Sequence, residues 1–349
     1  MDPSGNMMSL HTLPHKKEYV LFLDTSMRQT CSVNCPLDIP ELKDQGIEVR
    51  FVDPIDPNAF KNASDNKTRA YFGETLPNPK LNIFPITEVS EIGKHLGIPL
   101  IIDNTAAPYI CKPFLHGASI IVHSTTKYIG GQGSAIGGII VDSGKFDWGK
   151  DPKRQPNLND PDPSYHGMVW TEFAKAVGPI AYIVRARFVG LRDIGAALSP
   201  QSAFNIIQGL ETVSLRMEKH CSNAAKVAEY LSSHNKVSRV IYAGLDEGEA
   251  GERANKYLKG GHGALCGIEL KGGKASGEKF INNLNMFYHV ANIGDARSLA
   301  IHPASTTHSQ LSDEEMESAG VTPSYVRLSI GIEHIDDIIE DLKNALDAA

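Results

Sequence analysis

The sequence predicts an α/β protein in which helices cover a mostly parallel sheet, followed by a smaller C-terminal α+β domain. From Gly46 onward, short apolar runs alternate with amphipathic stretches, as strands and helices do in such a fold. The chain has 349 residues, of which 41% are hydrophobic, so it can bury a large core and is long enough for two domains. We expect a large domain over residues 46–234 and a small domain over 235–349. Residues 1–45 lack this order and stay unassigned.

The first clear unit is a helix followed by a buried strand. Gly97 is a suitable helix C-cap, and Pro99 prevents the helix from continuing. The apolar run 100–102 then predicts a strand that ends in Asp103. The apolar residues that recur at helical spacing before the cap are Ile86, Val89, Ile92 and Leu96.

The second unit also contains an apolar strand that ends in polar residues. The β-branched run 120–122 predicts a buried strand, and the polar residues 123–127, which end in Lys127, follow it directly. In open α/β sheets ligands bind beyond the carboxyl ends of the strands, where the loops converge. We therefore expect Asp103 and Lys127 to lie close together at this edge.

The remaining elements are a loop and two helices. Residues 151–166 are rich in Pro, Asp and Asn, which predicts a long surface or active-site loop. Two later segments each place apolar residues on one helical face. These residues are Ala224, Val227, Ala228 and Leu231 in the first segment, and Ile335, Ile338, Ile339, Leu342 and Leu346 in the second.

Lys127 has surroundings that suit a Schiff-base lysine. It lies at a strand end and is followed by Gly130, Gly131 and Gly133, and an amine placed there can have a lowered pKa. The hydroxyls of Ser124 and Thr126, with backbone amides of the glycine-rich turn, make a phosphate cradle.

Asp103 can pair with a protonated pyridine nitrogen, which is how proteins make pyridoxal phosphate (PLP) an electron sink. Taken singly, these residues also have ordinary interpretations. A strand-end aspartate is more often a cap or turn former, and a lone lysine is usually a solvated charge. A dinucleotide-binding loop is excluded at Gly131–Gly138, because the glycine spacing is wrong and no suitable acidic residue follows about 20 positions later.

Composition excludes several classes of protein. The net charge of −7 argues against a nucleic acid or anionic membrane partner, and no apolar run has the length of a membrane span. The five scattered cysteines argue for a reducing compartment, so we expect a cytoplasmic protein. Cys31 and Cys35 have no second pair or nearby histidine, and no metal site is expected.

Longer motifs resemble the Cys/Met-metabolism family of PLP enzymes, and within it the O-acetylhomoserine sulfhydrylase branch. The resemblance extends from Gly46 to the C-terminus. The stretches that carry it are residues 74–79 (ETLPNP), 103–138, 199–212 (SPQ through QGLET), 294–308 (GDARSLAIHPASTTH) and 327–333 (RLSIGIE). Residues 161–167 (PDPSYHG) and 294–299 favour the sulfhydrylases over cystathionine synthases and lyases.

The resemblance implies a PLP-dependent transferase of fold type I, with a seven-stranded type of sheet, that acts as a homo-oligomer. Lys127 would hold PLP as a Schiff base, Asp103 would bind the pyridine nitrogen, and Ser124 and Thr126 the phosphate. The substrate's α-carboxylate would bind Arg327, assisted by Asn78 and Ser298. The implied reaction is a γ-replacement in methionine and cysteine biosynthesis, in which O-acetyl-L-homoserine and sulfide give L-homocysteine and acetate.

Two departures keep alternatives open. Residues 1–45 do not resemble the family's N-terminal region, which supplies phosphate and ring contacts, and the turn 103–109 is one residue shorter than the family's. Losing such contacts would cost the cofactor several kcal/mol of affinity, at roughly 1.5–3 kcal/mol for each hydrogen bond to a charged group. A cystathionine γ-synthase or γ-lyase, and a non-catalytic remnant of the family, are therefore the alternative functions.

Overall fold

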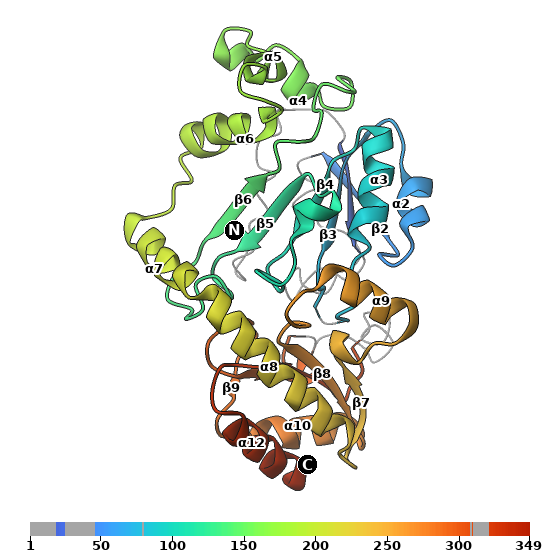
Figure 1. Ribbon diagram of the computed structural model, residues 1–349, viewed down its shortest axis with the longest axis vertical. Coiled ribbons are helices and arrows are strands. Elements are labelled where there is room, and N and C mark those ends of the chain that lie inside the picture. Colours follow the sequence, from blue (N-terminus) through green and yellow to red (C-terminus); the bar gives the residue numbers. More distant parts are fainter. Residues whose placement is uncertain (1–18, 25–45, 79, 308, 310–320) are drawn as a thin grey trace.

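The structure is a computed structural model that describes residues 19–24, 46–78, 80–307, 309 and 321–349. The cysteine pair Cys31 and Cys35 lies outside these ranges. Within them, two β-sheets with their helices are stacked along the long axis of the molecule (Figure 1).

The larger sheet has the strand order β2-β1-β3-β4-β5-β6. The strands β1 to β5 are parallel, and β6 pairs antiparallel with β5. The described residues thus contribute six strands, where the resemblance implied seven. Their bounds are β1 Tyr19–Asp24, β2 Ile47–Val52, β3 Thr68–Glu74, β4 Leu100–Asp103, β5 Ile120–Ser124 and β6 Gly138–Asp142.

Strand β1 lies in the segment that the sequence left unassigned. It is inserted between β2 and β3, so that Leu21 pairs with Val49 on one side and with Ala70 on the other. The assignment of residues 1–45 was therefore incomplete, because part of this segment belongs to the larger sheet. A strand with two neighbours is defined by backbone pairing, which its own sequence does not reveal.

One face of this sheet is covered by helix α3 (Ile86–Leu96), and helix α2 (Pro57–Ala63) connects β2 to β3. Gly97 ends α3 in the left-handed conformation with φ 69°, as predicted. Leu96 is the last residue of this helix and is 37% exposed, whereas Ile86 and Val89 are fully buried. Helix α3 approaches the sheet at Gly93, where a Cβ would lie 2.5 Å from the Ile98 carbonyl oxygen and 3.2 Å from the Tyr71 ring.

The other face is covered by short helical segments packed around Trp148, Leu158 and Trp170. They are α4 (Pro156–Asn159), the 3₁₀ turn Pro163–Tyr165, α5 (Trp170–Ala174), α6 (Ala181–Arg185) and the π-helical segment Ala186–Asp193. The predicted loop 151–166 therefore contains helical turns, and Leu158 fixes it to the sheet.

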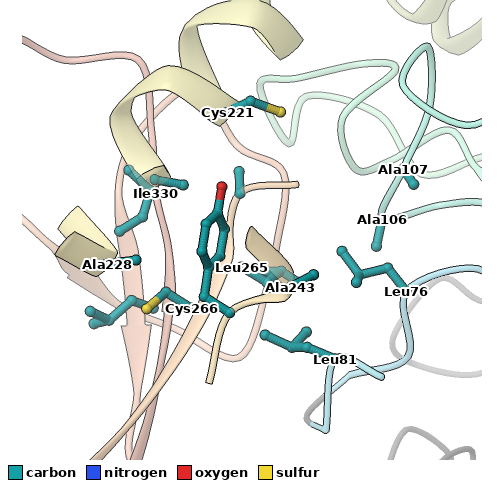
Figure 2. Close-up of a cluster of buried hydrophobic side chains, with 14 of the residues drawn as sticks. Leu76, Leu81, Ala106, Ala107, Cys221, Ala228, Ala243, Leu265, Cys266 and Ile330 are labelled. Atoms are coloured by element: carbon teal, nitrogen blue, oxygen red, sulfur yellow. The ribbon is translucent and has the colours of Figure 1, made fainter. Parts of the chain in front are cut away.

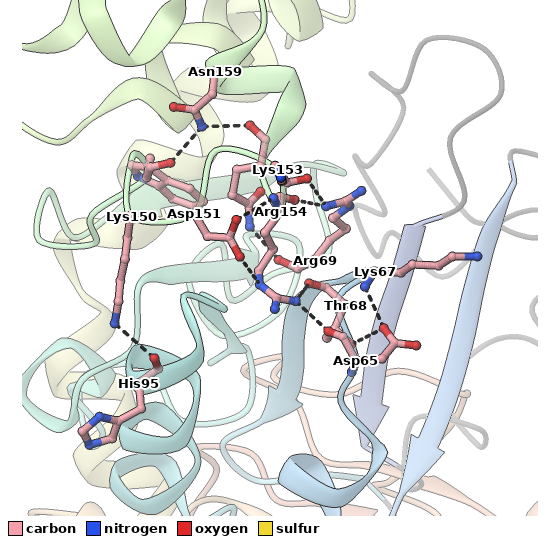
Figure 3. Close-up of polar contacts among 12 residues, drawn as sticks. Asp65, Lys67, Thr68, Arg69, His95, Lys150, Asp151, Lys153, Arg154 and Asn159 are labelled. Carbon is pink, nitrogen blue, oxygen red and sulfur yellow. Dashed lines mark hydrogen bonds and ion pairs between the residues drawn. The ribbon is translucent and has the colours of Figure 1, made fainter.

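Arg154 fixes the start of this loop to the edge of the sheet opposite the carboxyl ends of the parallel strands. Its guanidinium is 9% exposed and donates hydrogen bonds to the carbonyl oxygens of Asp65 (2.8 Å) and Thr68 (2.6 Å), just where β3 begins. An ion pair with Asp151 (3.3 Å) completes the contact, as Figure 3 shows. The start of the loop is thus a structural segment and does not reach the edge where Asp103 and Lys127 were expected.

The smaller sheet has the order β7-β8-β11-β10-β9 and is covered by α8, α10 and α12. It begins at Val237, near the expected domain boundary, but the boundary itself stays a prediction. The predicted apolar faces of α8 and α12 are confirmed: Val227, Leu231 and Leu342 are fully buried. The bounds are α7 Pro200–Glu211, α8 Val213–Ser232, β7 Val237–Ile241, α9 Gly248–Tyr257, β8 Leu265–Leu270, α10 Gly273–Asn282, β9 Tyr288–His289, β10 Leu299–Ile301, β11 Tyr325–Ser329 and α12 Ile335–Ala348, with 3₁₀ turns at Pro113–His116, Ala243–Leu245 and Pro303–Ser305.

One hydrophobic cluster joins the two sheets. Leu76 and Leu81, which follow β3, pack in the same cluster as Leu265 of β8 and Ile330, which follows β11 (Figure 2). His220 of α8 lies beside this contact, fully buried, with its Nδ1 hydrogen-bonded to the Ile330 carbonyl (2.6 Å). Burial lowers the pKa of His220 to about 4, so this imidazole is neutral near pH 7.

Candidate active site

Lys127 lies in a tight turn that leaves β5. The Lys127 amide donates to the Ser124 carbonyl (3.3 Å), and the Gly131 amide donates back to the Lys127 carbonyl (2.7 Å). Gly131 has φ 72°, and a Cβ on Gly130 would lie 2.8 Å from the Thr125 carbonyl oxygen. The glycine-rich sequence is therefore required by the turn itself, which folds the chain back over the end of β5.

Asp103 ends β4, next to β5 in the sheet. Its Oδ1 accepts a hydrogen bond from the Thr105 amide (2.8 Å), and the Thr105 hydroxyl accepts one from the Ser124 amide (2.8 Å). Burial raises the pKa of Asp103, while the Thr105 hydrogen bonds and the positive charge of Lys127 act to lower it. Asp103, at the end of β4, and Lys127, in the turn after β5, are thus neighbours whose charges interact, as the strand-end argument predicted.

The two hydroxyls expected at the phosphate lie on either side of this turn. Ser124 is buried at the end of β5, and the Thr126 Oγ1 accepts a hydrogen bond from the Gly137 amide (3.0 Å). A Cβ on Gly137 would lie 2.9 Å from the Thr125 Oγ1. The side chains of Thr125 and Ile206 fill the space beside Gly137, so only glycine fits at this position.

Arg327 lies on β11, between Gly267 of β8 and Ile301 of β10. Its Nη2 donates to the carbonyl oxygen of Asn292 (3.0 Å), and the side-chain Oδ1 of the same Asn292 accepts a hydrogen bond from the Lys127 Nζ. Burial lowers the pKa of Arg327, although nearby Tyr325 and Tyr128 act to raise it. Arg327 and Lys127, 200 positions apart in the numbering, thus share one partner.

The other two expected substrate residues differ in their contacts. The Ser298 side chain is fully buried, and its Oγ donates to Glu333 Oε2 (2.9 Å) and accepts from the Gly331 amide (2.9 Å). The backbone N–H of Asn78 donates to Glu74 Oε2 (3.3 Å). Glu74 ends β3 and lies opposite Asp103 on the adjacent strand β4. Asn78 therefore lies near the cofactor end of the site, and the Ser298 hydroxyl is engaged by the protein itself.

Polar atoms without protein partners support a ligand at this place. Within the described ranges, Asn78 Oδ1, Thr125 Oγ1 and Arg327 Nε are buried and have no hydrogen-bond partner. Buried polar atoms are normally satisfied, so such atoms around a lysine and an aspartate indicate a polar ligand. PLP fits this donor set, because it offers an aldehyde to Lys127, a ring nitrogen to Asp103 and a phosphate to the turn.

Two residues that the sequence analysis missed hold the site together. Asn292 contacts both Lys127 and Arg327, as described above. Arg216 of α8 lies beneath the lysine turn and donates to the carbonyl oxygens of Tyr128 (2.6 Å) and Ile129 (2.9 Å). Nothing in their local sequence distinguishes them from ordinary polar residues, except that each lies within a few positions of a family motif.

The fold and this site define a PLP enzyme, and comparison with known proteins supports that class. Residues 39–347 match the family described as Cys/Met metabolism PLP-dependent enzymes, and the chain belongs to that family. The predictions of the family, the fold class and the cofactor are therefore confirmed.

Individual relatives agree with this assignment. The chain is 52% identical over 308 residues to an O-acetyl-L-homoserine sulfhydrylase of Leptospira meyeri, covering 86% of this chain and 69% of that protein. It is 47% identical over 306 residues to a homocysteine synthase of Schizosaccharomyces pombe, covering 87% of this chain and 71% of the other. A crystal structure of an O-acetylhomoserine (thiol)-lyase from Campylobacter jejuni, with N′-pyridoxyl-lysine-5′-monophosphate at one position, superimposes with a TM-score of 0.85 at 38% identity, covering 94% of this chain and 77% of that one.

Two searches of the described residues concern other classes of site. No group of three or more His, Cys, Asp or Glu side chains there could hold a metal ion. None of the helices in the same part of the chain combines the length and the hydropathy needed to cross a bilayer.

Proposed function

We propose that this protein catalyses the γ-replacement that converts O-acetyl-L-homoserine and sulfide into L-homocysteine and acetate, in methionine and cysteine biosynthesis. The observation that carries the proposal is that Asp103 and Lys127 follow neighbouring strands of the larger sheet, and that partly buried Arg327 of β11 contacts the same Asn292 as Lys127. The names of the relatives supply the substrates. In the net reaction the Cγ–O bond to acetate breaks and a Cγ–S bond to sulfide forms, so that hydrosulfide and the ester give thiol and acetate.

Each residue would have a defined role. When bound, PLP supplies an electron sink that stabilises negative charge at the substrate carbons. Lys127 holds the cofactor and then moves protons at Cα and Cβ as a general base, and Asp103 keeps the ring nitrogen protonated. Arg327 binds the substrate carboxylate, for which its planar fork is better suited than a lysine ammonium. Ser124 and Thr126 would bind the phosphate and Asn78 would assist at the carboxylate, whereas the Ser298 hydroxyl stays bonded to Glu333 and Gly331.

The partly buried side chain of Arg327 supports its proposed role. A guanidinium whose pKa is lowered by burial, and whose Nε has no hydrogen-bond partner among the described residues, is stabilised by an incoming anion. A surface ion pair, the ordinary role of such an arginine, does not apply, because the protein provides no carboxylate partner for Arg327 within the described ranges.

We also propose that the protein is a homo-oligomer in the cytoplasm. The supporting observation for assembly is a series of large apolar side chains exposed from just before α7 to the start of α8. They are Ile194, Leu198, Phe204, Ile207, Leu210 and Leu215. The cysteines of the described residues, Cys111, Cys221 and Cys266, are buried and unpaired, which supports a reducing compartment.

The test begins with the cofactor. Purified protein is incubated with PLP and reduced with borohydride, and the attachment site is identified by peptide mass spectrometry. We expect the label on Lys127, lost in Lys127→Ala and retained in Lys175→Ala, a matched control whose exposed ammonium contacts Glu172. Label on another lysine, or none in folded protein, would contradict the proposal and favour the non-catalytic remnant.

The reaction is then tested with two nucleophiles. Loaded protein is given O-acetyl-L-homoserine with either sulfide or L-cysteine, and acetate, homocysteine and cystathionine are measured. We expect homocysteine with sulfide at a kcat/KM well above that for cysteine. A preference for cysteine, with cystathionine as the product, would instead assign the protein to the cystathionine synthases.

A further inference from the structure

Asn292 contacts both functional groups of the proposed site with different atoms. Its side-chain Oδ1 accepts a hydrogen bond from the Lys127 Nζ, whereas its backbone carbonyl accepts one from the Arg327 Nη2 (3.0 Å). A substitution at position 292 can therefore remove the contact with the amine and leave the contact with the guanidinium in place.

The backbone that follows Asn292 is fixed by hydrogen bonds to both sheets' segments. The Gly294 amide donates to the Ser329 Oγ on β11 (3.1 Å), and the Ala296 amide donates to the Gly131 carbonyl in the lysine turn (2.8 Å). Gly294 has φ 72°, and a Cβ there would lie 2.6 Å from the Tyr128 amide nitrogen. The segment Asn292–Ala296 thus joins the lysine turn of the larger sheet to β11 of the smaller one.

We propose that Asn292 is a positioning residue that sets the place of the Lys127 amine relative to the carboxylate bound at Arg327. An amino acid whose carboxylate is held by Arg327 has its Cα at a fixed distance from the Asn292 carbonyl. The Asn292 side chain places the Lys127 amine over that Cα whenever the amine is not bonded to the cofactor. This inference rests on the proposed function, since it assigns Lys127 the proton transfer and Arg327 the carboxylate.

The physical reason for a polar residue at position 292 is the freedom of a lysine side chain. Four rotatable bonds let Nζ occupy many positions, and a general base works only within hydrogen-bond reach of the proton it takes. The Asp103 carboxylate also interacts with the charge of Lys127, and a contact with it would draw the amine toward the ring-nitrogen end of the site. The Asn292 amide oxygen offers a neutral acceptor on the carboxylate-binding side, so the amine is held there without gaining a second negative neighbour.

The first experiment tests the contact and needs no cofactor or activity. Lysines of the cofactor-free protein are labelled with a trace of acetic anhydride at fixed pH, and the rate at Lys127 is read by mass spectrometry relative to Lys175. In Asn292→Asp the new carboxylate favours the protonated, unreactive amine, so Lys127 should label about 10-fold more slowly. In the control Asn255→Ala, which changes an exposed side chain of α9, the Lys127 rate should stay at the parent value. An unchanged rate in Asn292→Asp would overturn the contact, whatever the protein catalyses.

The second experiment separates positioning from binding. PLP-loaded protein is given L-2-aminobutyrate, which has no leaving group on Cγ, and exchange of its Cα proton is followed in deuterated water. Asn292→Ala should slow exchange by about 10- to 100-fold, because a misplaced base loses that much. The affinity for the amino acid should stay within about 3-fold, since the Arg327 contact is with the backbone. Asn292→Gln, which keeps the amide oxygen on a longer side chain, should restore part of the rate.

The outcomes that would overturn the positioning role differ from those that would overturn the proposed function. Equal losses of rate and affinity in Asn292→Ala, or an unchanged exchange rate, would overturn the positioning role even where the cofactor is bound to Lys127. Failure of PLP to attach to Lys127 in the parent protein would overturn the proposed function, and the labelling result would still decide whether Asn292 holds the amine.

Discussion

Gly209 provides a sharp test of how helix α7 supports the lysine turn. A Cβ at this position would lie 2.3 Å from the Gly130 carbonyl oxygen, 2.6 Å from the Ile129 carbonyl oxygen and 2.7 Å from the Gly130 Cα. All three are backbone atoms of the turn that carries Lys127, so no flexible side chain can move aside. We therefore expect Gly209→Ala to displace either α7 or the turn.

The magnitude follows from two opposing effects. Alanine favours a helix over glycine by about 1 kcal/mol, which alone would make the variant more stable. Overpacking against rigid atoms costs about 1–3 kcal/mol or more, and a distance of 2.3 Å is at the severe end of that range. The expected net loss is about 1–2 kcal/mol of the free energy of unfolding.

Urea denaturation of Gly209→Ala measures this loss, and the matched control is Gly149→Ala. The control adds the same methyl group where the nearest atom is the Asp147 Oδ1 at 3.5 Å, an ordinary contact, so its stability should change by less than about 0.5 kcal/mol. The PLP affinity of Gly209→Ala should also fall, because the displaced turn carries the cofactor lysine. A Gly209→Ala protein at least as stable as the parent, with unchanged PLP affinity, would refute the close contact between α7 and the turn.

Three further substitutions test single contacts. Arg154→Met should lower the free energy of unfolding, measured by urea denaturation, by about 3 kcal/mol, because two backbone carbonyls lose a charged donor at a buried site. The control Lys175→Met should have little effect on stability. A loss below about 1 kcal/mol in Arg154→Met would contradict the structural role of this arginine. The pKa of His220 is about 4 in the folded protein, below the ordinary 6.5, so the unfolded state binds a proton first as the pH falls. The free energy of unfolding should therefore fall by up to about 3 kcal/mol between pH 6.5 and pH 4. His220→Phe should show a flatter pH profile of stability, and equal slopes would refute the assignment. Ser298→Ala should lower thermal stability with little change in KM, given the buried contacts of its hydroxyl; a large rise in KM with unchanged stability would instead favour the substrate role.

Local pattern was enough to predict the elements that carry the cofactor residues. The apolar runs before Asp103 and Lys127 formed β4 and β5 as expected, because strands buried on both faces require continuous apolar residues. Parallel neighbours end at the same edge, so the two polar residues had to meet there. The predicted helix cap at Gly97 was correct for a similarly local reason, since glycine adopts a positive φ at no steric cost.

Local pattern failed where packing decided the outcome. Leu96 fits the helical periodicity of α3 yet is 37% exposed, and the helix lies closest to Ile98 and the Tyr71 ring at Gly93. Residues 151–166 have the composition of a loop, and only the contacts of Leu158 and Arg154 with the sheet reveal helical turns fixed in place. The strand β1 was not assigned either, since its place depends on β2 and β3 pairing on both sides.

The sequence by itself predicted the fold class and the strand ends that carry Lys127 and Asp103, because each depends on residues that are neighbours in the chain. Only the tertiary structure decided how Arg327, Asn292 and Lys127 meet, and that the Ser298 hydroxyl turns toward Glu333. These contacts join segments that lie up to 165 residues apart. Periodicity and spacing describe order along one segment, whereas such contacts depend on how the two sheets pack against each other through their shared hydrophobic core.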